Sequence, residues 1–249
     1  MYWSEHNPAE SFRITDDVVD VAYAIACRCL PVDHAHALRH ALQEALPWLA
    51  DEESAGIHPV HGAESGNGWM RPENPDDLLY LSRRTKLTLR LPRHRLDDAG
   101  ALNGRVIEIA GHRLSVGDST IRLLSPITTI FARHVVIGVQ ADEQAFLAAM
   151  VKRLGDMDIH PKKALCGMEK TIATPQGGVR TRSLMLADLT VEESVRLQQR
   201  GLGPARLLGC GLFIPHKDVD EVRGLSVDRC IRRISASVPH ASARWRSKS

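Results

Sequence analysis

Residues 201–211 read Gly201-Leu-Gly-Pro-Ala-Arg-Leu-Leu-Gly-Cys-Gly211, with four glycines in eleven positions. Glycine has no Cβ, so it reaches positive φ values and lets backbone N–H groups approach a phosphate closely. A Gly-x-Gly pair on each side of Arg206 could therefore cradle a nucleic-acid backbone. No Gly-Lys-Ser/Thr follows, which excludes a Walker-type P-loop, and a strand rather than a helix is expected next, which excludes a dinucleotide fingerprint. A second interpretation stays open, in which Gly201 ends a helix and a bulged strand follows.

The elements around this segment predict the fold of the second half. Thr190-Val-Glu-Glu193 has the spacing of a capping box, so we expect a helix from there to about Arg200. A helix capped by Asp142 is expected earlier in this half. The order becomes βαββαβ, which gives an antiparallel four-stranded sheet with two helices on one face, the ferredoxin-like arrangement. The open face of such a sheet often binds RNA. The expected strands cover residues 129–139, 164–174, 179–186 and 208–214, and the turn Pro175-Gln-Gly-Gly178 joins the middle two.

The first half shows the same order of elements without sequence identity to the second. A helix capped by Asp33 is expected to end near Pro47, and a short one to cover residues 93–102. The long polar loop 66–75 is a candidate binding element. We therefore predict an α+β protein of two tandem ferredoxin-like (βαββαβ) domains, residues 1–125 and 126–249. The expected strands here cover residues 18–29, 56–60, 78–82, 86–91, 105–109 and 112–116, and residues 30–32 are expected to form a turn.

Composition limits the class of protein. The chain has 249 residues and is 43% hydrophobic, which suits one large domain or two smaller ones. No apolar run approaches the roughly 18 residues of a membrane span, and the start lacks the pattern of an export signal, so we expect a cytoplasmic protein without membrane contact. The five cysteines are odd in number and form no C-x-x-C, so neither a disulfide framework nor a zinc site is indicated. We expect no metal and no cofactor.

Charge is distributed unevenly along the chain. Residues 1–64 carry 3 Lys/Arg against 11 Asp/Glu, whereas residues 201–249 carry 9 against 4, although the net charge is only +2. This asymmetry favours a polyanion bound mainly on the C-terminal side. Charges that are simply solvated remain the alternative.

With its flanks, the glycine-rich segment resembles the glycine-rich loop of the Cas6 family in the repeat-associated RNA-binding superfamily, and most closely the Myxococcus-type variant. The resemblance implies tandem ferredoxin-like domains that bind the hairpin of a CRISPR repeat, as pre-crRNA and as crRNA, and cut once at its 3′ base. It further implies a 2′-hydroxyl attack that leaves a 2′,3′-cyclic phosphate and a 5′-hydroxyl without a metal, and other Cas subunits as further partners. It covers about residues 18–217 and includes the segments 31–38, 81–92, 182–189 and 209–217.

Such a reaction needs a general base, a proton donor and groups that stabilise the phosphorane charge. The family places its histidine near the first helix, so His34, at the expected helix N-terminus, is the first candidate for the base. His36 is rotated roughly 200° away from it on a helix and should serve a different surface. Tyr80, Ser82 and Lys86 would share one strand face if the chain stays extended across residues 83–84. The candidate catalytic residues are His34, His58, His61, Tyr80, Ser82 and Lys86.

Candidate RNA ligands are mainly arginine, which pairs with phosphate and stacks on bases, and glycine in the segment quoted above. Each charged residue could equally be a solvated surface group. The candidates are Arg83, Arg84, Lys162, Lys163, Arg180, Arg182, Gly201, Gly203, Arg206, Gly209, Gly211 and Lys217.

Two other functions compete with the nuclease. The first is a non-catalytic RNA-binding subunit of a CRISPR effector complex that keeps the same fold. The second, of a different class, is a regulator that binds a small molecule or a metal, because ferredoxin-like domains host many functions. The sequence shows no ligand cluster with metal spacing, which disfavours the second.

Overall fold

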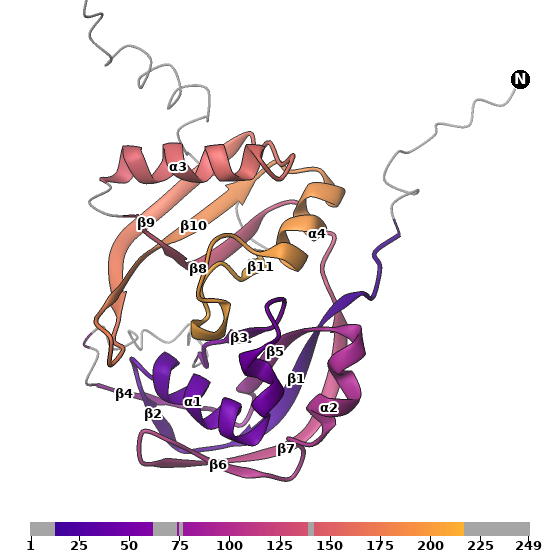
Figure 1. Cartoon of the computed structure of the whole chain (residues 1–249), viewed down its shortest axis with the longest axis vertical. Coiled ribbons are helices and arrows are strands. Elements are labelled where there is room, and N and C mark those ends of the chain that lie inside the picture. The colour runs from indigo at the N-terminus through magenta and orange to yellow at the C-terminus, as the bar shows by residue number, and fades with distance from the viewer. Residues whose placement is uncertain (1–12, 62–73, 75–76, 139–141, 217–249) are drawn as a thin grey trace, which may run out of the picture.

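The computed structural model describes residues 13–61, 74, 77–138 and 142–216. They form two lobes, one above the other in Figure 1, and each lobe is built on its own sheet. The first lobe contains the sheet of strands between residues 18 and 123, and the second contains the sheet of strands between residues 130 and 215. None of the helices in the described part of the chain is long and apolar enough to cross a membrane.

The second lobe has the expected βαββαβ order. Its strands are arranged β11-β8-β10-β9, every neighbouring pair is antiparallel, and α3 and α4 connect them in the ferredoxin-like manner. Its elements are β8 (Ile130–Val136), α3 (Glu143–Gly155), β9 (Lys163–Ile172), β10 (Val179–Ala187), α4 (Val191–Arg200) and β11 (Phe213–Pro215).

Both helices of this lobe begin at the residues that the sequence predicts. Asp142 accepts a hydrogen bond from the N–H of Ala145 at 2.8 Å and so caps α3. Thr190 accepts from the N–H of Glu193 at 3.1 Å, and the Glu193 carboxylate accepts from the N–H of Thr190 at 2.7 Å. The capping box is therefore confirmed, and each cap satisfies N–H groups that a helix leaves unpaired.

The first lobe keeps the same core arrangement with additions. Its main sheet has the order β3-β5-β1-β7-β6, in which β3, β5, β1 and β7 correspond to the four ferredoxin-like strands and β6 extends the edge. The hairpin of β6 and β7 turns at Ala110 and Gly111, both with positive φ, as the sequence predicts. Its elements are β1 (Val18–Ala26), β2 (Cys29–Pro31), α1 (Ala35–Ala45), η2 (Pro47–Ala50), β3 (Gly56–His58), β4 (Leu78–Tyr80), β5 (Lys86–Pro92), η3 (Arg93–Arg95), α2 (Leu96–Gly100), β6 (Val106–Ile109) and β7 (His112–Leu123).

Several expected boundaries are wrong. The single strand expected at residues 18–29 is divided, because β1 ends at Ala26 and β2 pairs with β4 in a separate two-stranded sheet. The turn expected at residues 30–32 is therefore mostly strand. Asp33 does not cap α1; His34 occupies that position, and Asp33 instead accepts a hydrogen bond from the N–H of Ala173 at 2.7 Å. The last strand begins only at Phe213, because Arg206–Leu208 forms the 3₁₀ turn η4.

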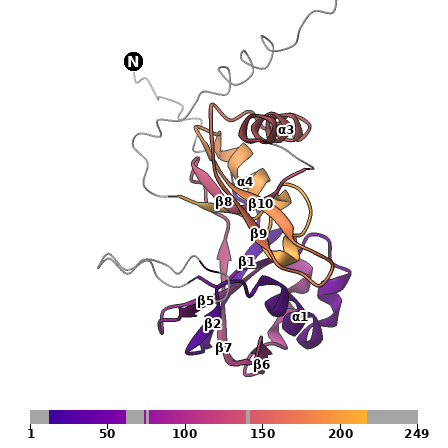
Figure 2. The same ribbon diagram turned by 90° about the vertical axis from the view of Figure 1, so that its left-hand side faces the viewer.

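Apolar side chains form a separate core in each lobe and a smaller cluster between them. The clusters within the lobes bury β1, β5 and α1 in one case and β8, β10, α3 and α4 in the other. The cluster between the lobes joins Ala35 of α1, Ile172 of β9, and Leu208 and Cys210 of the glycine-rich segment. In Figure 2 the helices α1 and α3 lie to the right and the strands β5 and β8 to the left, so the helices cover one side of the molecule.

Candidate functional site

Three glycines of residues 201–211, namely Gly201, Gly209 and Gly211, are needed for packing between parts of the chain. Gly201, Gly203, Gly209 and Gly211 all have positive φ, between 68° and 83°. A Cβ at Gly209 would collide with the ring of Pro59, and one at Gly211 would collide with the carbonyl of Leu202. The interpretation of Gly201 as a helix C-terminus is confirmed, because it caps α4. The close approach that Gly201, Gly209 and Gly211 allow is to other parts of the protein itself.

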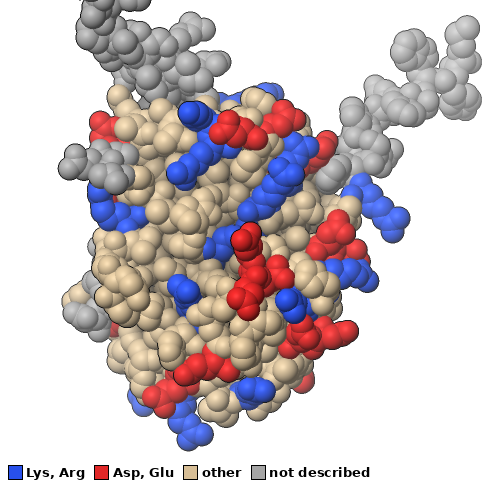
Figure 3. Space-filling view, viewed as in Figure 1, with Lys and Arg blue, Asp and Glu red and all other residues tan. Residues whose placement is uncertain are grey.

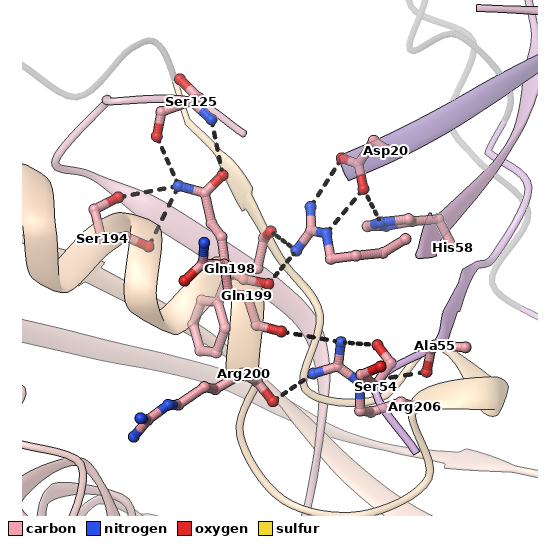
Figure 4. A network of polar contacts seen from close by, with 12 residues as sticks. Asp20, Ser54, Ala55, His58, Ser125, Ser194, Gln198, Gln199, Arg200 and Arg206 are labelled. Carbon is pink, nitrogen blue, oxygen red and sulfur yellow. Dashed lines mark hydrogen bonds and ion pairs between the residues drawn. The ribbon is translucent and has the colours of Figure 1, made fainter. Parts of the chain in front are cut away.

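The side chain of Arg206, within residues 201–211, forms hydrogen bonds with both lobes (Figure 4). Its guanidinium donates to the carbonyls of Ser54 at 2.8 Å and Ala55 at 3.3 Å in the first lobe. It also donates to the carbonyls of Gln199 at 3.2 Å and of Arg200 in the second lobe. All three guanidinium nitrogens are engaged. Burial lowers the pKa of Arg206 to about 10, which still leaves it charged at neutral pH. The geometry favours an anchoring role over phosphate binding.

A second arginine, Arg90, is fully buried and crosses between the lobes beside Arg206. Arg90 of β5 donates to both carboxylate oxygens of Asp20, and its remaining nitrogen donates to the carbonyls of Gln198 at 3.0 Å and Phe213 at 2.7 Å. Burial alone would raise the pKa of Asp20, but the charge of Arg90 and the polar contact with His58 hold this pKa well below its usual range. Asp20 and Arg90 each interrupt an apolar strand in the sequence, which could have indicated a buried ion pair. Neither residue is among the candidates predicted from the sequence.

His58, a candidate base, belongs to this network. Its Nε2 lies 3.5 Å from Oδ1 of Asp20, and the side chain is only 15% exposed. Burial lowers the pKa of His58, against the opposing effect of Asp20. The lowered pKa favours the neutral form, but the ring faces the carboxylate between the lobes (Figure 4).

His34 is 1% exposed, and the protein engages both of its ring nitrogens. Nδ1 lies 2.8 Å from the carbonyl of Pro31, and Nε2 accepts the N–H of Val60 at 3.0 Å. A carbonyl only accepts, so Nδ1 carries the proton in this arrangement. Through these two contacts His34 connects the start of α1 to the segment after β3. This arrangement favours a structural role over that of a general base.

The exposed side of α1 carries residues suited to acid–base chemistry. His36, Arg39 and His40 are spaced i, i+3 and i+4, so they are neighbours on the helix surface. His36 is half-buried and has no hydrogen bond or ion pair with any residue that the structure describes. The N-terminus of α1 contacts the β9–β10 hairpin through Asp33 and Ala173, so this turn of the helix lies where the lobes meet.

Tyr80, Ser82 and Lys86 do not share a strand. Thr85 donates its N–H to the carbonyl of Ser82 at 3.0 Å, which closes a turn between β4 and β5. The chain is therefore not extended across Arg83 and Arg84, so the condition for a shared strand face is not met, and both arginines are exposed on that turn. Tyr80 is 63% exposed on β4. His61 is half-buried at the end of a described segment, and most of the loop 66–75 lies outside the described residues.

Three of the predicted RNA ligands of the second lobe, Lys163, Arg180 and Arg182, lie on β9 and β10, and Lys162 directly precedes β9. Lys162 is exposed, and Lys163 forms an ion pair with Asp188 at 3.3 Å. Arg180 pairs with Glu169 through two nitrogens, and Arg182 donates to the carbonyl of Gly167 at 3.1 Å. Lys217, and most of the basic residues counted at the C-terminal end, lie outside the described residues.

Charges of both signs are interspersed over the helix-bearing side (Figure 3), so no single-sign patch covers it. Among the described residues, no group of three or more His, Cys, Asp or Glu side chains is arranged to hold a metal ion.

Comparison with known proteins identifies the family of this two-lobed chain. Residues 19–218 match the family model described as Cas6 Crispr. The CRISPR-associated endonuclease Cas6 of Myxococcus xanthus (strain DK1622) is 32% identical over 197 residues, which are 79% of this chain and 81% of that protein. The chain belongs to the Cas6 family.

Solved structures agree with this Cas6 fold at low sequence identity. A CRISPR associated protein Cas6 covers 80% of this chain and 100% of its own, with a TM-score of 0.57 and 8% identity. A Cas6-related protein from Pyrococcus furiosus covers 82% of this chain and 99% of its own, with a TM-score of 0.58 and 13% identity. A RAMP protein described as binding different RNA substrates covers 80% of this chain and 100% of its own, with a TM-score of 0.54 and 11% identity. These likenesses establish the tandem ferredoxin-like fold of this Cas6 chain.

Proposed function

We propose that this protein is an endoribonuclease that cuts CRISPR repeat RNA at the 3′ base of its hairpin without a metal. The observation that carries the proposal is the 32% identity to the Myxococcus xanthus endonuclease across both lobes. The RNA would be bound as pre-crRNA and held as crRNA, in the cytoplasm, with other Cas subunits as further partners.

The proposed reaction is a transesterification. The 2′-hydroxyl next to the scissile phosphate loses its proton to a general base and attacks the phosphorus. The bond from phosphorus to the 5′-oxygen of the next nucleotide breaks, and that oxygen takes a proton from a general acid. The products are a 2′,3′-cyclic phosphate and a 5′-hydroxyl. The protein needs to place a base, an acid and a cation around one phosphate.

The exposed side of α1 supports this arrangement best. His36 is half-buried on this side of the helix, and an imidazole nitrogen can accept the proton of a hydroxyl group. Arg39 follows three positions later and could oppose the phosphorane charge, although its Nε now donates to Gln43 at 3.1 Å. We therefore place the reacting phosphate beside the first turns of α1 and assign His36 as the base.

The other candidate residues take lesser parts in the proposal. His61, Tyr80, Ser82 and Lys86 remain candidates for the general acid, and the exposed Tyr80 is the first of them. His34 and His58 would act only if the protein released the contacts described above. Three proposed RNA ligands, Arg83, Arg84 and Lys162, are exposed. Lys163, Arg180 and Arg182 are further proposed ligands, whose charges are partly engaged. Lys217 is also proposed and lies outside the described residues.

A cleavage assay tests the proposal. Purified protein is incubated in EDTA with the labelled repeat RNA of the CRISPR array of the same organism, alongside His36→Ala, His34→Ala and His40→Ala. We expect one cut ending in a cyclic phosphate, a loss of about 100-fold or more in rate for His36→Ala, and a near-normal rate for His40→Ala. A cut that needs added metal would overturn the mechanism, and no binding of the hairpin would overturn the function.

The alternative is a non-catalytic RNA-binding subunit of an effector complex. The engagement of both ring nitrogens of His34 favours this alternative, because the histidine at the start of the first helix is then unavailable as a base. Tight hairpin binding with no cut by the wild-type protein would select this alternative.

A further inference from the structure

The carboxylate of Asp33 connects the two lobes at the start of α1. Its Oδ2 accepts the N–H of Ala173, 140 residues later in the chain, at 2.7 Å. Ala173 directly follows β9, at the point where the hairpin turns toward β10. In Figures 1 and 2 this hairpin extends from the second lobe to the side of α1. The contact therefore joins the helix that carries His36 to the hairpin of the other lobe.

Asp33 makes this contact in place of a helix cap. An aspartate just before a helix usually accepts an N–H group of the first turn. Among the residues that the structure describes, no side chain caps α1, and the Asp33 carboxylate is directed to the other lobe instead. The start of the helix thus lacks a stabilising contact that its sequence could supply. A position that breaks a local rule in favour of a distant contact is typical of functional sites.

This hydrogen bond is too exposed to hold the lobes together by itself. Asp33 is half-buried and Ala173 is exposed, so water competes for both groups. The buried guanidinium groups of Arg90 and Arg206 and the apolar cluster between the lobes supply that attachment. The Asp33 contact therefore determines how the hairpin lies against α1, and its loss leaves the lobes attached.

The hairpin tip forms a closed turn directly after the contact. The Thr174 hydroxyl donates to the carbonyl of Gly177 at 2.5 Å, and the N–H of Gly177 donates to the carbonyl of Thr174 at 3.0 Å. Arg180, a proposed RNA ligand, follows on β10 and pairs with Glu169 of β9. These bonds make the tip and Arg180 one unit with the base of the hairpin, so fixing Ala173 fixes their place beside α1.

We propose that Asp33 is a positioning residue, which holds the β9–β10 hairpin against α1 so that RNA bound by the second lobe presents its scissile phosphate to His36. The proposal deepens the proposed function and rests on it. Asp33 precedes His36 by only three residues. A shift of the hairpin relative to this turn of the helix moves the phosphate relative to the base and leaves the other RNA contacts in place. A misplacement of about 1 Å can slow a reaction by roughly 100-fold.

The experiment compares three substitutions in the full-length chain. Asp33→Ala removes the acceptor of the Ala173 N–H, whereas Asp33→Asn keeps a side-chain carbonyl oxygen that can accept it. Asp97→Ala is the matched control, because Asp97 is an exposed carboxylate in the first turn of α2, in the same lobe. The affinity for the repeat hairpin and the single-turnover cleavage rate at saturating RNA are measured separately for each variant.

We expect Asp33→Ala to lower the saturated rate by roughly tenfold or more and to change the hairpin affinity by less than about threefold. Asp33→Asn and Asp97→Ala should cut within about threefold of the wild-type rate. A wild-type rate for Asp33→Ala would overturn the proposal. An equal loss in Asp33→Asn would also overturn it, because the reaction would then need the charge of Asp33 and not its contact with Ala173.

A second measurement separates this proposal from the proposed function. The repeat hairpin carries one 4-thiouridine at its 3′ base and is crosslinked to each variant, and the amount attached to the α1 peptide is compared. Strong attachment in the wild type and in Asp33→Asn, with weak attachment in Asp33→Ala, supports the positioning role even if the RNA is never cut, which would sink the nuclease alone. Equal attachment in Asp33→Ala overturns the positioning role even if the wild type cuts normally.

Discussion

Arg90 and Asp20 form a two-point ion pair, with Nε to Oδ1 at 2.8 Å and Nη2 to Oδ2 at 2.9 Å. They lie on adjacent strands of the first lobe, where residues 20 and 90 are directly opposite in the register. The same guanidinium also bonds two carbonyls of the second lobe. Asp20 therefore fixes the direction of the arginine that links the lobes (Figure 4).

Loss of Arg90 should destabilise the protein strongly. Arg90→Met should lower the free energy of unfolding by about 3 kcal/mol, because it leaves the mostly buried Asp20 carboxylate and two carbonyls without their donor. Urea unfolding at neutral pH measures the loss. The double variant Asp20→Asn/Arg90→Met is the matched control and should recover part of it, since no unpaired charge remains. Equal stability of Arg90→Met and wild type would contradict the role of this pair.

Stability should fall in acid partly through Glu52. Its carboxylate accepts from the Ser54 hydroxyl at 2.5 Å, from Arg95 at 3.2 Å and from His94, and these contacts lower its pKa from 4.5 to about 2. A lowered folded-state pKa adds stability above pH 4.5 that is lost as the pH falls toward about 2. The difference in free energy of unfolding between wild type and Glu52→Gln should therefore shrink across this interval. Glu53→Gln, at an exposed neighbour, should show no such change, and a constant difference for Glu52→Gln would refute the prediction.

Gly209 should not tolerate a side chain. Gly209→Ala combines the strain of φ +82° with a collision against Pro59, and we expect a loss of about 3 kcal/mol in the free energy of unfolding. Gly104→Ala is the control for strain alone, because Gly104 has φ +76° and open space around it, and it should lose only about 1 kcal/mol. Thermal and urea unfolding compare the two. Similar losses would show that the contact between Gly209 and Pro59 matters little.

Substitution of His34 should lower the free energy of unfolding and should have a smaller effect on the rate of RNA cleavage. His34→Ala leaves the buried N–H of Val60 and the carbonyl of Pro31 without their partner, which should cost about 3 kcal/mol of stability. His40→Ala, on the exposed side of the same helix, should change stability by less than about 0.5 kcal/mol. Unfolding is measured first, and cleavage is then measured at a temperature where both variants are folded. A stable but inactive His34→Ala would restore His34 as the general base.

Most of the second lobe could be predicted from the sequence, because the signals are local. Asp142 and the pair Thr190 and Glu193 fix helix starts through hydrogen bonds that span only three residues. The turn at residues 175–178 and the apolar alternation of β9 and β10 determine the hairpin in the same way. The division of residues 18–29 could not be found like this, since β2 pairs with a strand about fifty residues later in the chain.

The sequence by itself determined the periodicities, the caps and the four glycines that reach positive φ, because each depends on neighbours within a few positions. Only the tertiary structure decided how the polar residues are used. Arg206 was expected to face a phosphate and instead bonds carbonyls about 150 residues earlier in the chain. His34 was expected at an open helix end and is buried against Val60. The contacts of a polar side chain depend on which groups the completed fold places around it. A buried polar group that has no hydrogen-bond partner is costly, so it bonds to complementary groups nearby.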